Sequence, residues 1–210
     1  MKKIKINFKK PGKKEIDLIV NFLNKGRVIV YPTDTIYGLG CRATDGRAIK
    51  RIYKIKRREK KKPFLVLVDS VKMAKKYCYV NKEQEKFLKE VWSKNPPYPL
   101  CQGGKIKFPA PPLSGGLYGR AVTVVLESKR NLPKELIGKE KIPPTPAYRT
   151  GRPLYQGGKK GKGLAVRLPK NDFLIKIIKR INVPLVSTSV NVSGEKSLVS
   201  VKNVEKYFKS

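Results

Sequence analysis

Four segments of the chain concentrate residue types that bind small polar or anionic ligands. The first is YPTDTIYGLG at residues 31–40, where a β-branched strand runs into a turn rich in hydroxyl groups. The glycines that follow allow another group to approach the backbone closely. Thr33 and Thr35 could offer their hydroxyls to a polar substrate, or they could cap the turn locally. The residues alone leave both interpretations open.

The second segment is the cationic run KRREKKK at residues 56–62, just before an apolar run, FLVLV, at 64–68. Such a run suits a triphosphate, because arginine makes forked contacts with phosphate and lysine supplies a compact charge. The alternative is a solvated charge run that complements the end of a helix. We expect Lys56 and Arg58 to be exposed to solvent.

The other two segments place polar groups on apolar strands. LAVRLP carries Arg167, which is costly to bury unless it faces a cleft or an anion, and which could instead point outward. VPLVSTSVNVSG opens from a buried strand into Ser187, Ser189 and Asn191. Ligands of open α/β sheets bind at strand ends, so these groups could meet a ligand, or they could cap a polar turn.

The chain contains no histidine, which excludes Ser-His-Asp and Cys-His catalysis. Its three cysteines, Cys41, Cys78 and Cys101, form no C-x-x-C pair, so no zinc site is expected. A reaction here must use lysine, arginine, hydroxyls, backbone amides, a few carboxylates, or a metal carried by the substrate.

The bulk composition fits a basic globular domain. The chain has 210 residues, 40% of them hydrophobic, and a formal net charge of +34. This charge favours polyanionic partners such as RNA or nucleotides but says nothing about chemistry. No apolar run reaches the length of a membrane span, and the basic N-terminus lacks the apolar stretch of a signal peptide, so we expect a cytoplasmic protein.

Hydrophobic periodicity predicts alternating strands and helices. This alternation favours an α/β domain with a mixed sheet. Strands are expected at 3–8, 27–31, 64–68, 122–126, 164–168 and 183–187. Helices are expected at 13–25, 70–77, 82–92, 173–181 and 200–208, and a further helix is expected to start after Asp45, its N-cap.

Two stretches interrupt this pattern, at residues 94–119 and 142–162. Both are rich in proline and glycine, and PLCQGGK at 99–105 recurs as PLYQGGK at 153–159. Neither glycine pair lies between a strand and a helix start, as a phosphate loop requires. We interpret both stretches as low-complexity loop insertions in a single domain spanning residues 1–210.

The order of the motifs resembles the YrdC-like threonylcarbamoyl-AMP synthase family, in its short, single-domain form. The resemblance covers nearly the whole chain outside the two insertions. One departure is that Trp92 is followed by Ser93 rather than by the family's Pro-Gly-Pro. The resemblance to this family rests on five segments, which are YPTDTIYGLG at 31–40, IKRREKKKP at 55–63, TVVL at 123–126, LAVRLP at 164–169 and STSVNVSG at 187–194.

The resemblance implies an open, twisted mixed sheet with helices and a basic concave face. It also implies an activity: L-threonine, bicarbonate or CO2, and ATP with its Mg²⁺ give threonylcarbamoyl-AMP and pyrophosphate. Partner proteins then transfer the threonylcarbamoyl group to tRNA, and contact with tRNA or double-stranded RNA is a further expectation. The rival hypothesis is a non-enzymatic factor that binds double-stranded RNA or the ribosome through the same basic face.

The resemblance also implies roles for individual residues. Lys56 and Arg58 match the catalytic cations and, with Lys62, Ser189 and Asn191, the groups that bind ATP. The residues that match threonine-binding positions are Thr35, Thr123, Arg167 and Ser187.

Overall fold

The computed structural model shows one α/β domain built on a single sheet. It describes residues 3–4, 6–7, 10–33, 36–59, 64–93, 122–129, 131–137, 162–195, 198 and 200–209. In these residues the strands are β1 (Ile29–Pro32), β2 (Tyr37–Arg42), β3 (Leu65–Leu67), β4 (Cys78–Tyr79), β5 (Thr123–Ser128), β6 (Gly163–Arg167) and β7 (Leu185–Ser189). The helices are α1 (Lys13–Asn24), α2 (Gly46–Ile55), α3 (Val71–Tyr77), α4 (Lys82–Val91), α5 (Asp172–Ile181) and α6 (Val201–Lys209).

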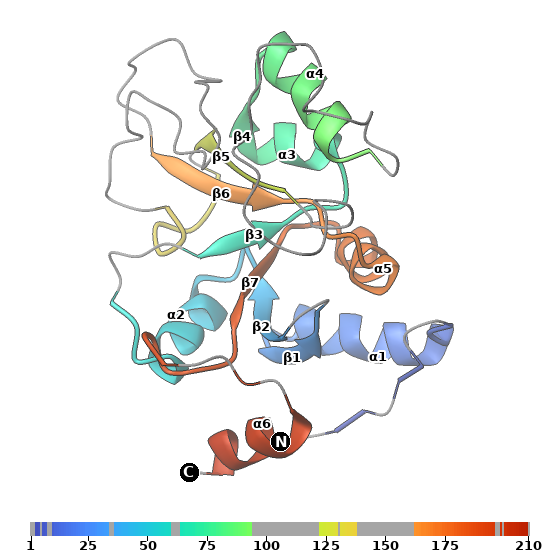
Figure 1. Cartoon of the computed structure of the whole chain (residues 1–210), viewed down its shortest axis with the longest axis vertical. Helices are drawn as coiled ribbons and strands as arrows, with labels where there is room; N and C mark the ends of the chain where they lie inside the picture. The colour runs from blue at the N-terminus through green and yellow to red at the C-terminus, as the bar shows by residue number, and fades with distance from the viewer. Residues whose placement is uncertain are drawn as a thin grey trace, which may run out of the picture.

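The strands lie in the order β1-β2-β7-β3-β6-β5-β4 (Figure 1). The β3–β6 pair is parallel and the other neighbours are antiparallel. This arrangement confirms the predicted mixed sheet. The uninterrupted apolar run at 64–68 indeed supplies β3, a strand with neighbours on both sides, as such runs typically do.

The two faces of the sheet differ in burial. Val66, Val166 and Val186 are aligned across β3, β6 and β7, and each is at most 1% exposed. The residues on either side of them in sequence point to the opposite face, because side chains alternate along a strand. On that face Thr123 is exposed and Arg167 and Ser187 are half-buried. The sheet therefore packs one face into the core and leaves polar groups on the other.

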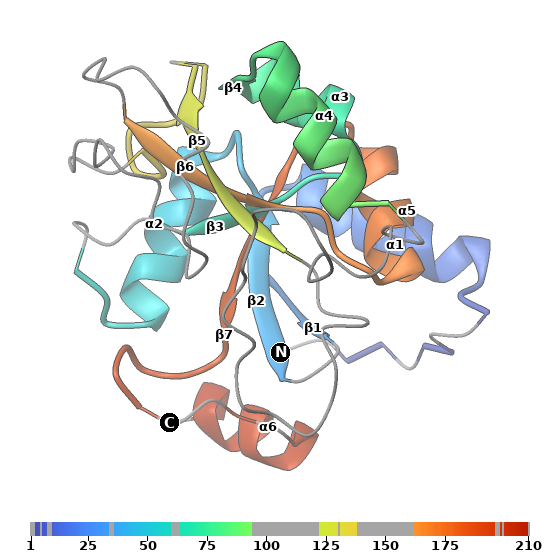
Figure 2. The same cartoon turned by 45° about the horizontal axis from the view of Figure 1, so that its top comes forward.

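Local sequence signals account for the helices. Asp45 caps α2 as predicted, since its carboxylate accepts from the backbone N–H groups of Arg47 and Ala48. Asn171 caps α5 in the same way, and Asn182 ends it in the left-handed conformation with φ 51°. In Figures 1 and 2, α2 lies to the left of β2 and β7, and the adjoining α1 and α5 lie to the right.

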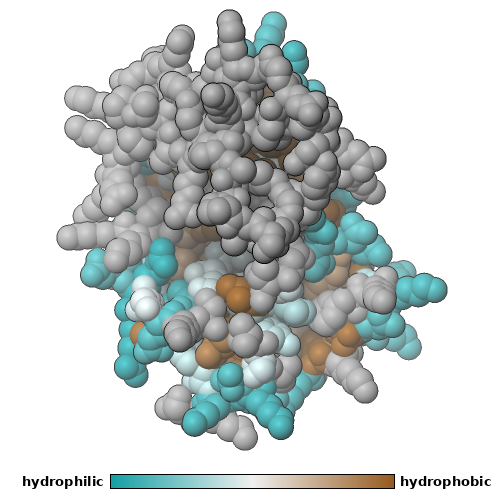
Figure 3. Space-filling model, in the orientation of Figure 1, coloured by the Kyte–Doolittle hydropathy of each residue, from teal (hydrophilic) through white to brown (hydrophobic). Residues whose placement is uncertain are grey.

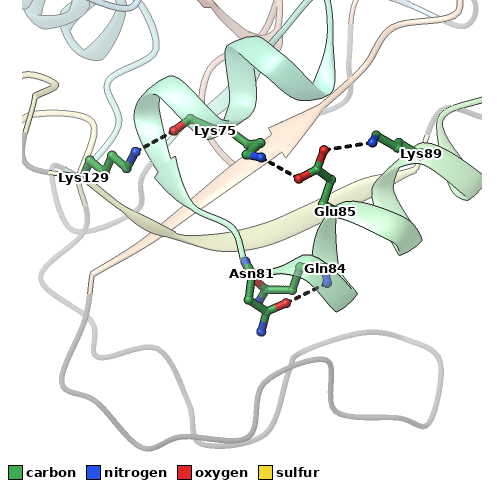
Figure 4. A network of polar contacts seen from close by, with 6 residues as sticks. All are labelled: Lys75, Asn81, Gln84, Glu85, Lys89 and Lys129. Atoms are coloured by element: carbon green, nitrogen blue, oxygen red, sulfur yellow. Dashed lines mark hydrogen bonds and ion pairs between the residues drawn. The ribbon is translucent and has the colours of Figure 1, made fainter.

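Helices α3 and α4 form a separate pair beside β4 (Figure 2). Asn81 and Gln84 make a reciprocal capping box at the start of α4 (Figure 4). Glu85 bridges Lys75 of α3 and Lys89 of α4, and Figure 4 shows its carboxylate between the two ammonium groups.

The predicted strand at 3–8 is wrong for its described residues, which lie outside any strand. Ile4 and Ile6 pack against the core, so their alternation reflects burial without strand pairing. Strand β2 was missed because its two glycines are typical of a turn. The two-residue β4 is too short to leave a periodic signal.

The predicted insertions at 94–119 and 142–162 lie outside the described residues, except for residue 162. The described residues that flank the first of them are close together, because the Trp92 indole N–H donates to the carbonyl of Val122 at 3.0 Å. Among the described residues, no helix is both long enough and apolar enough to cross a membrane.

Candidate functional site

Strand register brings three of the predicted ligand residues to one face of the sheet. Thr123 lies opposite Arg167 in the β5–β6 pair. On the central strand, Leu67 is the partner of Arg167 and Leu65 is the partner of Ser187. Neighbouring strands are about 4.8 Å apart and each strand residue rises about 3.3 Å, so the backbones of Ser187 and Arg167 lie roughly 12 Å apart, a span that suits a small amino acid between their side chains. We call Thr123, Arg167 and Ser187 the strand-face triad.

Ser187 has a buried partner that the sequence analysis did not identify. The Tyr31 hydroxyl, on a side chain only 3% exposed, lies 2.7 Å from Ser187 Oγ. Burial raises the pKa of Tyr31 well above its ordinary value, so this phenol stays neutral. Tyr31 belongs to the YPTDTIYGLG motif, but its position in an apolar strand gave no sign of a polar role.

Lys56 lies inside the protein, so the expectation that it is solvated is wrong. Its side chain is 1% exposed, and Nζ donates to the carbonyls of Ser189 and Asn191 at 2.6 and 2.9 Å and to Asn191 Oδ1 at 2.8 Å. An ammonium group has three hydrogens, and these contacts use all of them. The reason lies in the backbone, because Lys56 is the C-cap of α2 and follows the helix directly. We call Lys56, Ser189 and Asn191 the buried lysine cluster.

Two effects disfavour the charged form of this lysine. Burial, followed by the nearby Arg58 guanidinium, lowers the pKa of Lys56 to about 8. The three oxygen acceptors act in the opposite direction, since they favour the ammonium form.

Ser189 and Asn191 are bound to each other as well as to Lys56. Ser189 Oγ donates to Asn191 Oδ1 at 2.6 Å, and Asn191 Nδ2 donates to the Glu195 carbonyl at 2.6 Å. The backbone N–H of Ser193 donates to the Lys56 carbonyl at 2.9 Å. The polar turn after β7 is therefore stabilised by hydrogen bonds within the protein. Asn191, which is 7% exposed, caps this turn, which is one of the two alternatives that the sequence left open.

Arg58 lies beside this cluster, at the entry to β3. Its guanidinium carbon is 5.1 Å from the centroid of the Phe64 ring, a cation–π distance. Arg57 has a left-handed backbone with φ 46°, and the Arg58 N–H donates to the Tyr53 carbonyl. Arg58 is half-buried, so full solvation is wrong for this residue too.

The structure describes the first motif, residues 31–40, except for residues 34 and 35. Thr33 Oγ1 donates to the Ile36 carbonyl at 2.6 Å and accepts from the Ile36 N–H at 3.3 Å. This is the local turn capping that the sequence left as an alternative. Thr35 and Lys62 lie outside the described residues, and their predicted contacts with threonine and ATP stay predictions.

The described part of the chain brings together no three His, Cys, Asp or Glu side chains that could hold a metal. What it offers instead are hydroxyl and guanidinium donors on the open sheet face, with cations near the end of α2. Figure 3 shows hydrophilic side chains around the rim of the described part of one face and paler, more apolar residues toward its middle. These described groups can bind and orient an anionic ligand.

The family model of the Sua5/YciO/YrdC domain, described as "Telomere recombination", matches residues 21–100 and 117–210. The chain belongs to the Sua5/YciO/YrdC family. The residues left out between the two matched stretches, 101–116, fall within the first predicted insertion.

Curated relatives carry the name threonylcarbamoyl-AMP synthase. The protein from Pseudoalteromonas translucida is 25% identical over 90% of this chain and 78% of its own length. The human protein is 27% identical over 87% of this chain, and the Pyrococcus abyssi protein 25% over 92%. The chain spans only 48% and 44% of the length of these two.

Solved structures share the fold. The E. coli YciO structure superposes with a TM-score of 0.65 at 19% identity, covering 96% of this chain and 76% of that one. P. abyssi Sua5 complexed with L-threonine gives 0.63 at 23% identity, covering 94% of this chain and 44% of that one. These likenesses establish a shared architecture.

Proposed function

We propose that the protein is a threonylcarbamoyl-AMP synthase that joins L-threonine, bicarbonate or CO2, and ATP. The observation that carries this proposal is the strand-face triad, in which two hydroxyls and a guanidinium share one face of the sheet. The names of the curated relatives and the threonine complex of P. abyssi Sua5 support the choice of substrate.

The reaction needs no protein nucleophile, which suits a chain without histidine. The threonine amine attacks CO2, a C–N bond forms, and a proton leaves to give a carbamate. When bicarbonate is the source, its C–OH bond breaks and the proton leaves with that hydroxyl as water. A carbamate oxygen then attacks the α-phosphorus of ATP, and the bond to the β-phosphate breaks. The products are threonylcarbamoyl-AMP and pyrophosphate.

In this proposal the protein contributes positioning and charge. Arg167 binds the threonine carboxylate, and Ser187 and Thr123 donate to oxygens of the bound amino acid. Arg58 and Lys62 neutralise the triphosphate, which brings its own Mg²⁺. Thr35 lines the threonine side of the site, as the family resemblance implies.

For Lys56, Ser189 and Asn191, direct contact with ATP and support of the neighbouring turn are two different roles. Their side-chain polar groups already bond to one another, so direct contact with phosphate would require at least one of these bonds to break. We propose that this cluster acts mainly by fixing the turn after β7, which adjoins the triad.

The proposal is tested by incubating the purified protein with ATP, L-threonine, bicarbonate and Mg²⁺ and measuring pyrophosphate. We expect pyrophosphate release that depends on both threonine and bicarbonate. Release at the same rate without threonine, or no release by folded protein, would refute the activity. Its product would supply partner proteins that modify tRNA.

A second candidate function, binding of tRNA or double-stranded RNA, is favoured by the net charge of +34. Lysine–phosphate contacts release counterions, so affinity should fall steeply and log-linearly with salt concentration. Titration of fluorescent tRNA and duplex RNA at several salt concentrations tests this function. Affinity without pyrophosphate release would favour the non-enzymatic hypothesis.

A further inference from the structure

We propose that Tyr31 is a positioning residue that orients the Ser187 hydroxyl as a hydrogen-bond donor toward the bound amino acid. The inference rests on the proposed function, because it takes Ser187 as a threonine contact. It adds a residue that the sequence motifs did not assign to the site.

The geometry links strands that are not neighbours. Tyr31 lies on β1 and Ser187 on β7, and β2 runs between them. Register places Tyr31 opposite Gly38 and Ser187 opposite Gly40, so both side chains lie on the same face of the sheet. The Tyr31 ring crosses β2 on this face and brings its hydroxyl to 2.7 Å from Ser187 Oγ.

Glycines on β2 make this crossing sterically feasible. A Cβ at Gly38 would come within 2.8 Å of Tyr31 Cε2, and one at Gly40 within 3.0 Å of Cε1 and 2.4 Å of the Val186 carbonyl oxygen. Neither glycine has a positive φ, so the backbone conformation does not require them. The space that the tyrosine ring occupies therefore explains Gly38, and the ring together with the Val186 carbonyl explains Gly40.

The direction of the bond follows from burial. The Tyr31 hydroxyl is enclosed, and an enclosed donor without an acceptor is costly. Ser187 Oγ is the partner that the structure gives to this hydroxyl, so the phenol donates and the serine oxygen accepts. Ser187 then keeps its own hydrogen, for which the described residues supply no acceptor.

The consequence is a fixed donor on the open face. Ser187 is half-buried there, beside Leu65 and two strands from Arg167. Tyr31 occupies one of the two lone pairs of the serine oxygen, so the Ser187 hydrogen is directed away from Tyr31 and is available to a ligand. This arrangement suits an acceptor, such as a carboxylate or carbamate oxygen of the bound amino acid.

The test is a double-mutant cycle read by equilibrium binding of L-threonine. Tyr31→Phe keeps the ring and removes the hydroxyl. We expect it to weaken threonine binding by about 3- to 10-fold, the range of one neutral hydrogen bond, and Ser187→Ala to weaken it at least as much. The double variant should bind within about twofold of Ser187→Ala alone, because Tyr31 acts through Ser187.

Tyr53→Phe is the matched control, since Tyr53 is also buried and its hydroxyl donates to a backbone carbonyl, that of Glu135, at 3.0 Å. It should leave threonine affinity unchanged. Unchanged affinity in folded Tyr31→Phe, or losses that multiply in the double variant, would overturn the proposal.

A second readout does not depend on the substrate. The χ1 rotamer of Ser187, measured from Hα–Hβ couplings in serine-labelled protein, should be single in the wild type and averaged in Tyr31→Phe. A single rotamer in both proteins would overturn the positioning role. If wild-type protein binds no threonine, the proposed function fails, and the couplings still decide whether Tyr31 orients Ser187.

Discussion

Two lysine-centred clusters in this protein use the same chemistry in different surroundings. Lys56 is enclosed and donates three hydrogen bonds to the turn that contains Asn191. Lys75 and Lys89 flank Glu85 on the surface of α3 and α4 (Figure 4). In the sequence the lysines of both clusters are charged side chains near helix ends. Only the fold shows that one cluster is buried and the other exposed.

We infer from this difference that burial, more than charge, determines how much a lysine contributes to the free energy of unfolding. Exposed ion pairs contribute little, because water and salt screen them. A buried ammonium group is different, because its removal leaves enclosed acceptors without partners. The turn after β7 should therefore depend on Lys56 far more than the α3–α4 pair depends on Glu85.

The largest expected effect is that of Lys56→Met. The change removes the lysine donor from the Ser189 and Asn191 carbonyls and from Asn191 Oδ1, which keeps its bond from Ser189 Oγ, and each unpaired buried group costs about 1–3 kcal/mol. We expect the free energy of unfolding in urea to fall by about 3 kcal/mol or more.

Lys129→Met is the matched control for this prediction. Lys129 Nζ donates to a single backbone carbonyl, that of Lys75, at 2.7 Å near the surface. Its loss should cost about 1 kcal/mol or less. Equal losses in the two variants would show that burial does not determine how much these lysines contribute to stability.

Asn191→Ala should have the next largest effect. It removes one acceptor of Lys56 and Ser189 and the donor to the Glu195 carbonyl. We expect a loss of about 2–3 kcal/mol in urea unfolding. The exposed Asn131, which donates to the Lys76 carbonyl at 2.9 Å, provides the control Asn131→Ala. A stable Asn191→Ala variant with impaired kinetics would instead favour a direct ligand contact.

A smaller effect is expected in the pH dependence of the Lys56→Met loss. The pKa of Lys56 is about 8 in the folded protein, below its ordinary value of 10.5. Between these values the unfolded chain holds the proton more tightly, so the contribution of Lys56 to stability rises with pH. The difference between wild type and Lys56→Met should therefore grow from pH 7 to pH 10. A difference that shrinks would mean that the three acceptors outweigh burial.

The smallest effect is expected for Glu85→Gln. Hydrogen bonds from Lys75 and then Lys89 lower the pKa of Glu85 to about 2. Its contribution is therefore present above pH 4.5 and lost as the pH falls toward 2. Because the cluster is exposed, we expect urea midpoints of wild type and variant to agree within experimental reproducibility at pH 7. A clearly lower urea midpoint for Glu85→Gln at pH 7 would contradict the expectation that this exposed cluster contributes little to stability.

The fold could be predicted wherever a single periodicity dominated. The apolar run of β3, the helical spacing of Ile16, Ile19 and Leu23 in α1, and the Asp45 cap of α2 all have local causes. Strand β2 could not be predicted, since the need for Gly38 and Gly40 comes from groups on other strands, the Tyr31 ring on β1 and the Val186 carbonyl on β7.

The candidate site was predicted in its residue types but not in its contacts. Arg167 and Ser187 were identified from polar groups on apolar strands, and register brings them to one face. The burial of Lys56 could not be seen in a run of six cations within seven residues, because it depends on where the chain turns after α2. Tyr31 was missed because its partner lies 156 residues away.

The proposed function requires the strand-face triad to bind the amino-acid substrate. It is tested most directly by titrating ¹⁵N-labelled protein with L-threonine and mapping the amide shifts. We expect the shifts to cluster on β5, β6 and β7 around Thr123, Arg167 and Ser187, and the amides of α3 and α4 to stay unchanged. Shifts centred on the Glu85 cluster, or no shifts at saturating threonine, would contradict it.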